Sequence, residues 1–371
     1  MAHIEPTARL SVATLNDHIK KLTEPVFRKH LLLARLRERG GIIGGCTGKA
    51  FDWRVVFRRR EPTRGGDMTT MTFPRVNRYR TAELPWRRLQ YGEAISDFEK
   101  KANAGPEALI KLVAELTKRA TDDFNEFFHT ELYQDGNSTT TLNTIHGLAS
   151  MLTVSAAQTY GVFAAPLDTY AGLTTTLGNY GGSWTPGSSN SWPRGTGSVE
   201  YCFASPFVVD VSNTNHAAET KTWTYTWREC MRQLSTYMLN LQGNTPDLYM
   251  LTPESFRLAR QSMDDKERLE VTQGSPSVKL GFKTLSFEGV ELATEYGVPE
   301  TTTLSGGTSK TNHGYAITFD RWELRLLGQK QLLEVERDRD IETGTDRYAF
   351  NSWLNSRFES PCYFGQFVAV T

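Results

Sequence analysis

The sequence predicts an α+β protein, with separate helical and extended segments along one chain of 371 residues. Three observations predict this class. Strand-forming residues with turn residues between them predict a long two-stranded ribbon early in the chain. Apolar residues at helical spacing predict a long helix further on, and short strand-like stretches fill the last third. A chain of this length can bury a sizeable core and hold one large or two ordinary domains.

Composition limits the classes of protein that remain. The chain has 42 Lys and Arg against 42 Asp and Glu, so it lacks the basic excess of a dedicated nucleic-acid binder. The opening "MAHIEPTARLSVATLNDHIKKL" has no apolar signal-peptide core, and no run of 18 apolar residues occurs. We therefore expect a soluble protein made in a cytoplasm. The cysteines are scattered without a CxxC pair, which favours reduced thiols over a disulfide framework or a zinc site. They are Cys46, Cys202, Cys230 and Cys362.

The first 50 residues predict an N-terminal arm with one helix. Pro25 suits the first helical turn, apolar residues continue to Leu36, and Gly40 with Gly41 ends the helix. Five basic residues make its other face positive, which is typical either of a solvated face or of a face turned toward anionic cargo. They are Arg28, Lys29, Arg35, Arg37 and Arg39.

Residues 51–91 predict a long two-stranded excursion. "FDWRVVFRRR" suits a strand, "EPTRGGD" is turn chemistry, and "MTTMTFPRVNRYRTAELPW" returns in extended form because its prolines prevent a helix. Such a ribbon is not stable alone, so it must lie on something else. From Arg54 to Arg88 there are ten arginines and no lysine. Arginine favours bidentate pairing with carboxylates and stacking on aromatic rings, so the use of arginine without lysine is typical of an interface.

The clearest helix is predicted from Pro106 to about Tyr133, where "DG" stops it. At 1.5 Å per residue it would be about 40 Å long and act as a structural strut. Polar residues along it suggest a metal or acid–base site, but carboxylates on a long amphipathic helix usually face solvent, and we expect these to do so. The polar residues are Asp122, Asp123, Glu126, His129 and Glu131.

Three features organise the second half. Residues 160–200 are rich in Gly, Ser, Thr and aromatics, which is typical of a long surface loop or hairpin excursion. Lys221 to Gln242 carries an apolar stripe at helical spacing, with Gly243 just past its end. In "PDLYMLTPESF" a short buried strand precedes a helix capped by Thr252. The remainder alternates short strands and turns.

No motif of known catalytic chemistry stands out. The chain contains no GxSxG, no HExxH, no GxGxxG before a helix and no GxxxxGK[ST]. "GGIIGGCTGKA" resembles a phosphate-binding loop, but no buried strand precedes it and no Ser or Thr follows its lysine. The seven histidines are dispersed, and we expect His129 and His146 to be packing or surface residues. Active sites can be assembled from scattered residues, so an enzyme stays open as an alternative.

The order of elements is more informative than any motif. A basic arm and an extended hairpin precede the long helix that begins "GPEALIKLVAELTKRATDDF", a "HGLASML" turn and a helix followed by "PDLYMLTPESF". The closing half holds "FKTLSFEGVELATEYGVP", "HGYAITFDRWELRLL", a strand-rich return and a final strand. In this order the chain resembles the tailed-bacteriophage major capsid proteins of the HK97 fold. The resemblance covers nearly the whole chain and rests on architecture and loose patterns, not on an invariant signature.

The resemblance implies six segments. They are an N-terminal arm (1–50), an extended loop (51–100), a peripheral domain with a spine helix (101–155), an axial domain (156–319), the peripheral return strands and loop (320–355) and a terminal axial strand (356–371). It also implies self-assembly into hexamers and pentamers of an icosahedral head shell around double-stranded DNA, with no enzymatic activity, cofactor, metal or membrane. Portal and scaffold proteins and a decoration protein would be the other partners, in a virion assembled in the host cytoplasm.

Contacts between subunits follow from the same resemblance. The extended loop would lie over a neighbouring subunit, where its arginines pair with acidic groups and its glycines let the tip turn. These residues are Arg58, Arg59, Arg60, Arg64, Gly65 and Gly66. The peripheral loop carries both signs of charge, which suits contacts between identical copies. Its residues are Arg337, Asp338, Arg339, Asp340, Glu342, Asp346 and Arg347. The basic face of the arm is the candidate for contact with DNA inside the shell.

Two other classes of function stay open. An encapsulin-like nanocompartment shares the fold and encloses protein cargo, and an enzyme or nucleic-acid-binding protein with an unrecognised site is the other. Some members of the resembled family weld their subunits by a lysine–asparagine isopeptide bond, which needs a lysine on the extended loop. Asn351 or Asn355 could supply the amide and Glu359 a base, but no lysine occurs between Lys49 and Lys100. We therefore expect a shell held by non-covalent contacts.

Overall fold

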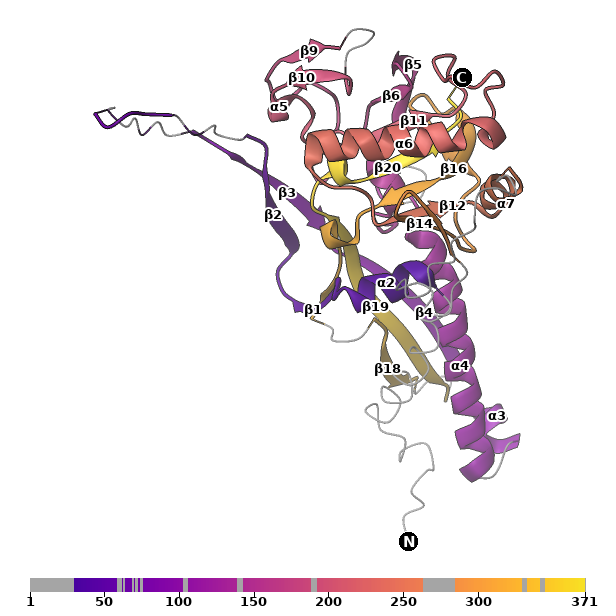
Figure 1. The fold of residues 1–371 in the computed structure, drawn as a ribbon. Helices are drawn as coiled ribbons and strands as arrows, with labels where there is room; N and C mark the ends of the chain where they lie inside the picture. The colour runs from indigo at the N-terminus through magenta and orange to yellow at the C-terminus, as the bar shows by residue number, and fades with distance from the viewer. Residues whose placement is uncertain are drawn as a thin grey trace.

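The computed structural model describes residues 30–58, 62, 64–68, 70, 73, 76–102, 106–138, 143–187, 192–262, 284–328, 332–340 and 344–370. Figure 1 shows a body with a long helix along its lower part and a thin ribbon that leaves it sideways. The helices are α2 Leu31–Glu38, α3 Asp97–Ala102, α4 Pro106–Glu131, α5 Val199–Cys202, α6 Trp223–Gln242 and α7 Pro253–Gln261, with 3₁₀ turns at Leu148–Met151, Phe319–Arg321 and Pro361–Tyr363. The strands are β1 Ile42–Cys46, β2 Ala50–Val56, β3 Tyr79–Pro85, β4 Arg87–Ile95, β5 Val154–Tyr160, β6 Phe163–Pro166, β7 Thr169–Tyr170, β8 Leu173–Thr174, β9 Trp184–Pro186, β10 Gly195–Gly197, β11 Phe207–Asp210, β12 Leu248–Leu251, β13 Leu285–Phe287, β14 Val290–Thr294, β15 Thr301–Thr303, β16 Ser309–Ile317, β17 Trp322–Leu327, β18 Glu334–Arg339, β19 Asp346–Phe358 and β20 Gly365–Val368.

A five-stranded sheet forms the lower part of the molecule in Figure 1. Its order is β1-β17-β19-β18, and β4 also pairs with β19, which is 13 residues long. Helix α4 lies alongside this sheet, and the predicted long helix from Pro106 is confirmed over 26 residues. Phe124 and Phe128 stack with ring centroids 5.9 Å apart on its buried side. This apolar stripe explains why the helix stays with the sheet rather than standing free.

A nine-stranded sheet forms the upper part, in the order β13-β14-β12-β16-β20-β11-β6-β5, with β15 paired to β16. Helix α6 runs across this sheet in Figure 1 and ends at Gln242, followed by Gly243, which adopts φ 67° as the predicted C-terminal cap. Thr252 caps α7 by accepting a hydrogen bond from the Ser255 amide at 3.3 Å. Both predicted helices are confirmed. The buried stripe of α6 comprises Trp227, Cys230, Met231, Leu234 and Met238.

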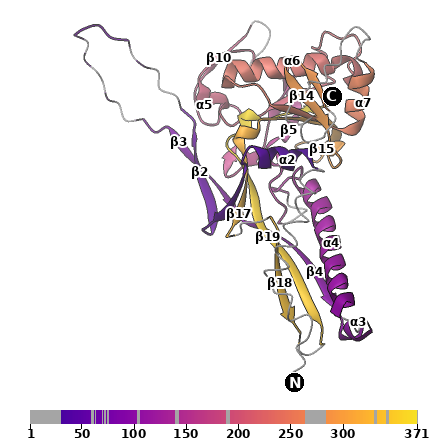
Figure 2. The ribbon, with the colours of Figure 1, turned by 60° about the horizontal axis from the view of Figure 1, so that its bottom comes forward.

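The early ribbon is formed by β2 and β3, paired from Ala50 with Pro85 to Val56 with Tyr79. Alternate β2 residues at its base are buried in the subunit's own core, so the base is anchored. Figures 1 and 2 show that the described residues of its outer half lie away from the body. Strand β4 instead belongs to the five-stranded sheet, where it pairs with β19 over nine residues. The projecting segment therefore ends near Pro85, earlier than the expected loop of residues 51–100.

Helix α2 is more deeply buried than the basic-face hypothesis allowed. All its residues from Leu31 to Leu36 are buried, and Arg35 is only 4% exposed. The Arg35 guanidinium forms ion pairs with Glu291 and, at 3.5 Å, with Glu38. The expectation that Arg35 faces anionic cargo is wrong, because its charge is neutralised inside the subunit. Four leucines make this helix apolar on more than one face. It therefore lacks the separate apolar and basic faces that the sequence predicted.

The remaining residues of the predicted basic face differ from one another. Arg39 is 41% exposed and pairs with Asp320 at 2.6 Å and with Asp247 at 3.5 Å. Arg37 is exposed. Arg28 and Lys29, like Pro25, lie outside the described residues. Among the described residues, Arg37 and Arg39 therefore keep the exposed position expected of a DNA-facing group, although Arg39 is paired within the subunit.

The Gly- and Ser-rich stretch is not a plain surface loop. Its described parts, 160–187 and 192–200, include the short pairs β7–β8 and β9–β10, and the full side chain of Trp192 is buried. Trp192 stacks on Phe207 at 5.3 Å between ring centroids, and Tyr170 donates a hydrogen bond to the Ser356 carbonyl at 3.0 Å. The aromatics of this stretch are anchors in the core, which explains their abundance among small residues. Among the described helices, none combines the length and the apolar character needed to cross a membrane.

Burial of His146 predicts a loss of stability in mild acid. Burial, reinforced by the nearby Arg87, lowers the pKa of His146 to about 4, while the unfolded chain would keep a value of about 6.5. Between these two values the unfolded chain binds the proton and the folded chain does not, so unfolding becomes easier as pH falls from 6.5 toward 4. We expect His146→Gln to flatten this dependence in urea melts measured at several pH values. Equal slopes for the variant and the wild-type protein would contradict the assignment.

Candidate assembly interface

The outer part of the ribbon exposes large apolar side chains. Met68 is 97% exposed and Phe73 84%; Val56 at the end of β2, Tyr79 at the start of β3 and Val76 just before it are also exposed. Exposed apolar groups on a projecting two-stranded element are typical of a surface that is covered in an assembly. Only the arginines and glycines of this segment were predicted to make contacts, although the apolar residues of "MTTMTFP" also indicate one. The apolar ribbon tip, defined as Met68 and Phe73, is the strongest candidate contact in the described chain.

The arginines of the ribbon are placed differently from expectation. Arg58 forms an ion pair of 2.8 Å with Glu200 of α5 in its own subunit, although its side chain remains 53% exposed. Arg64, Gly65 and Gly66 are exposed near the end of the ribbon. Arg59 and Arg60 lie outside the described residues. An acidic group on a neighbouring subunit would therefore have to compete with Glu200 for Arg58. Arg64, in contrast, keeps the exposed position predicted for it.

The charged peripheral loop proves to be the end of a hairpin. Arg337 on β18 pairs with Asp346 on β19 at 3.1 Å, and Arg347 pairs with Asp340. Arg337, Asp340, Asp346 and Arg347 are thus paired within the subunit, which differs from the expectation of pairing with the next copy. Glu342 lies outside the described residues.

The register of this hairpin explains the difference. Antiparallel pairing of β18 with β19 places Asp338 across from Arg347 and Arg339 across from Asp346. The ion pairs Arg337–Asp346 and Arg347–Asp340 join diagonal neighbours in this register, so the alternating signs are paired within the hairpin itself. The Asp338 side chain also accepts a hydrogen bond from the Arg339 amide at 2.8 Å.

Polar residues on α4 divide into two groups. Asp122, Asp123 and Glu126 are exposed, which confirms the expectation for these carboxylates. Glu131 is buried, where its carboxylate accepts a hydrogen bond from the Ile145 amide at 3.3 Å, and solvent exposure was the wrong expectation for it. Desolvation raises the pKa of Glu131, and that hydrogen bond opposes the shift. His129 is fully buried.

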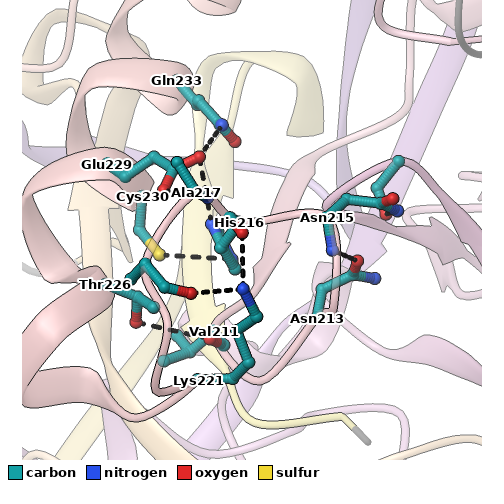
Figure 3. A network of polar contacts seen from close by, with 12 residues as sticks. Val211, Asn213, Asn215, His216, Ala217, Lys221, Thr226, Glu229, Cys230 and Gln233 are labelled. Atoms are coloured by element: carbon teal, nitrogen blue, oxygen red, sulfur yellow. Dashed lines mark hydrogen bonds and ion pairs between the residues drawn. The ribbon is translucent and has the colours of Figure 1, made fainter.

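One polar network brings a thiol, an imidazole and a carboxylate together. Figure 3 shows Cys230 and Glu229 of α6 beside His216, with 3.7 Å from the Cys230 sulfur to His216 Nε2 and 3.6 Å from His216 Nδ1 to Glu229. His216 Nε2 donates its hydrogen to the Asp210 carbonyl at 2.7 Å, so it cannot accept the thiol proton. Burial raises the pKa of Cys230 strongly, which keeps it a thiol. This arrangement lacks the activated nucleophile of a cysteine enzyme.

The rest of this network holds a loop in place. Lys221 donates from Nζ to the carbonyl of His216 at 2.6 Å and also to the carbonyl of Ala218 (Figure 3). The Ala217 amide donates to Glu229 at 2.9 Å. These contacts fasten the segment before α6 to the helix itself. All four cysteines are free, as the reduced-thiol prediction requires.

Comparison with known proteins identifies the fold. No protein-family model matches the chain, and no curated protein is similar to it in sequence. Among solved structures, the capsid protein of the native GTA particle is 10% identical, with 90% of this chain and 89% of that chain covered and a TM-score of 0.54. The cyanophage A-1(L) capsid protein is 12% identical, with 88% of this chain and 89% of that chain covered and a TM-score of 0.54.

These matches extend over nearly the whole of both chains, so they concern the complete architecture and not one shared motif. This chain has the mixed α+β fold of these phage and GTA-particle capsid proteins. The resemblance predicted from the order of elements is confirmed at the level of the fold. At such low identity, no residue role is transferred from those proteins to this chain.

Proposed function

We propose that this chain is a major capsid protein of the HK97-like type, which assembles into a closed icosahedral shell around phage double-stranded DNA. The observation that carries the proposal is the ribbon of residues 50–85, whose base is anchored in the subunit and whose apolar tip is left exposed by the described residues of the chain. A second copy of the chain is the partner that such a tip needs. The capsid fold of the structural neighbours supports this assignment.

The proposed division into domains is supported by the two sheets. The five-stranded sheet with α4 corresponds to a peripheral domain, and the nine-stranded sheet with α6 and α7 corresponds to an axial domain. Strand β20, from the end of the chain, lies between β16 and β11 in the second sheet. This placement suits the expected terminal axial strand. We assign residues 50–85, rather than 51–100, to the extended loop.

The shell is proposed to be held without covalent links. Asn355 is buried, where its side chain donates to the Pro85 carbonyl at 2.8 Å and accepts from the His146 amide at 3.0 Å. Asn351 is similarly engaged, accepting from Arg88 at 2.8 Å. Both amides therefore serve the subunit itself, and the loop has no lysine to attack them.

Detergent gels test this feature. Mature particles boiled in detergent with a reducing agent are expected to give a single band near the 41.8 kDa monomer, or slightly below if the N-terminal arm is clipped. The reason is that amide attack needs an amine nucleophile, and arginine stays protonated. A ladder of covalent oligomers with lysine–asparagine links in mass spectrometry would overturn the non-covalent assignment.

The remaining partners follow from the proposed shell. Arg64 and Arg339 are candidates for contacts between subunits, and Arg37 is a candidate for contact with DNA on the interior. Portal, scaffold and decoration proteins would bind the shell, and the protein would reside in the virion. A nanocompartment shell is the second candidate function, because it would use the same fold and the same apolar ribbon tip.

Light scattering and sedimentation test whether the purified chain forms a shell. The measurements are made with and without its scaffold and across a range of salt concentrations. We expect particles far larger than a hexamer. A monomer under every condition would rule out both shell functions. Nucleic acid extracted from particles of the native host separates the two: packaged double-stranded DNA supports the capsid, and protein cargo without DNA supports the nanocompartment.

A further inference from the structure

Three residues that are distant in the sequence meet where α2, α4 and β14 come together. His30 directly precedes α2, His129 lies in the last turn of α4, and Glu295 directly follows β14. One ligand-type atom from each lies within 4.8 Å of the others. The side chains of His129 and Glu295 are 1% and 4% exposed, and that of His30 is 14% exposed. We call these three residues the His–Glu cluster.

Two imidazole nitrogens converge on one carboxylate oxygen. His129 Nε2 lies 2.9 Å and His30 Nδ1 lies 3.4 Å from the same atom, Glu295 Oε1. Each contact would be an ion pair with a protonated histidine, but none of the three atoms makes a hydrogen bond of good geometry in the described part of the chain. Burying polar atoms without such hydrogen bonds costs folding free energy. We therefore expect an ion or molecule that all three atoms can bind.

The surroundings orient the cluster toward a common point. The second oxygen of Glu295 accepts from the Leu32 amide and from the Tyr133 hydroxyl, each at 3.4 Å, which leaves Oε1 facing the two histidines. Gly297 makes room for the ring of His129, since a Cβ at this position would lie 2.6 Å from Nδ1. Partners that fix the orientation of ligating side chains are a regular feature of metal sites.

Geometry favours a metal ion over protons alone. The two imidazole rings lie only 4.2 Å apart between centroids, so two protonated rings would repel each other. A divalent ion instead binds neutral imidazole and ionised carboxylate together. Ligand atoms about 2.0–2.2 Å from a tetrahedral zinc ion lie roughly 3.3 Å from one another, close to the separations of 2.9 and 3.4 Å in the cluster.

We propose that the His–Glu cluster is a structural site for a divalent transition-metal ion of the zinc class. His30 Nδ1, His129 Nε2 and Glu295 Oε1 would be the protein ligands, and water would take the fourth position on the more exposed side, next to His30. The ion fastens the start of α2 to the end of α4 and to the nine-stranded sheet. This inference goes beyond shell formation and does not depend on it.

Metal titration of the full-length chain tests the proposal. After removal of metal with a chelator, Zn²⁺ binding is measured by competition with a chromogenic chelator and by elemental analysis. We expect one zinc ion per chain, a higher melting temperature with zinc, and a visible absorption band when Co²⁺ replaces Zn²⁺. The substitution His30→Gln removes one ligand. We expect it to weaken zinc binding by at least about tenfold and to abolish the cobalt absorption band.

Control variants separate this site from other histidines. His216→Gln alters another buried histidine beside a carboxylate and is expected to leave zinc stoichiometry and affinity unchanged. His30 is the most exposed ligand, so His30→Gln should fold even if Glu295→Gln does not. Unchanged zinc affinity in His30→Gln, or no stoichiometric binding to the wild-type chain, would overturn the proposal. In the second case, histidine protonation followed by NMR would identify protons as the occupants.

Discussion

Replacing the apolar ribbon tip, as Met68→Ser with Phe73→Ser, is expected to abolish shell assembly and to leave the subunit folded. Both side chains are almost fully exposed in the isolated chain. Covering each on a neighbour would stabilise the contact by about 1.5–3 kcal/mol, and the loss is repeated at every copy in a shell. Sedimentation should then show only free subunits or small capsomers where the wild-type protein forms particles.

A matched variant in the same ribbon controls for the substitution itself. Thr70 is also exposed, and Thr70→Ala should assemble normally because it removes no large apolar group. Circular dichroism and thermal melting of the double variant should match the wild-type subunit, with stability changed by less than about 0.5 kcal/mol. Shells formed by the double variant with normal yield would show that the tip is not a contact. Unfolding of the double variant would place the tip in the core of the subunit.

The substitution Gly147→Ala is expected to destabilise the subunit by about 3 kcal/mol or more, at the upper end of what overpacking costs. A Cβ on Gly147 would lie 2.4 Å from the carbonyl oxygen of Leu132 and 2.7 Å from that of Glu131. The Leu132 carbonyl also accepts a hydrogen bond from the Leu148 amide at 2.9 Å, so the added carbon separates groups that must meet. Urea unfolding of the subunit measures the loss.

Gly92→Ala is the control for this change. Gly92 lies in β4 without a positive φ, and a Cβ there meets nothing within 4 Å. The free energy of unfolding of the Gly92→Ala variant should stay within about 1 kcal/mol of the wild-type value. Equal stability of the Gly147 and Gly92 variants would contradict the close approach between the "HGLASML" turn and the end of α4.

The elements that the sequence predicted well are those with local signals. Helix α4 has a proline at its start and a continuous apolar stripe, and α6 has Gly243 at its end, so periodicity and capping locate both helices. The ribbon is recognisable because turn residues separate two strand-forming stretches. The order of these elements was enough to indicate the fold.

Contacts between distant segments could not be predicted in the same way. The burial of Arg35 depends on Glu291, which lies on another element, and no local pattern reveals that pairing. The hairpin register that pairs Arg337 with Asp346 was hidden because the segment was interpreted as a loop. Cysteine and histidine spacing likewise gave no indication of the His–Glu cluster, whose members come from three separate elements.

Electron cryomicroscopy of the assembled protein tests directly whether the chain forms a shell through its ribbon. We expect a closed shell in which the ribbon of each subunit lies on a neighbouring subunit, with Met68 and Phe73 covered and the nine-stranded sheets gathered around the capsomer axes. A closed shell in which the ribbon tips remain in solvent would contradict the assigned contact. A chain that stays monomeric with its scaffold present would contradict the function itself.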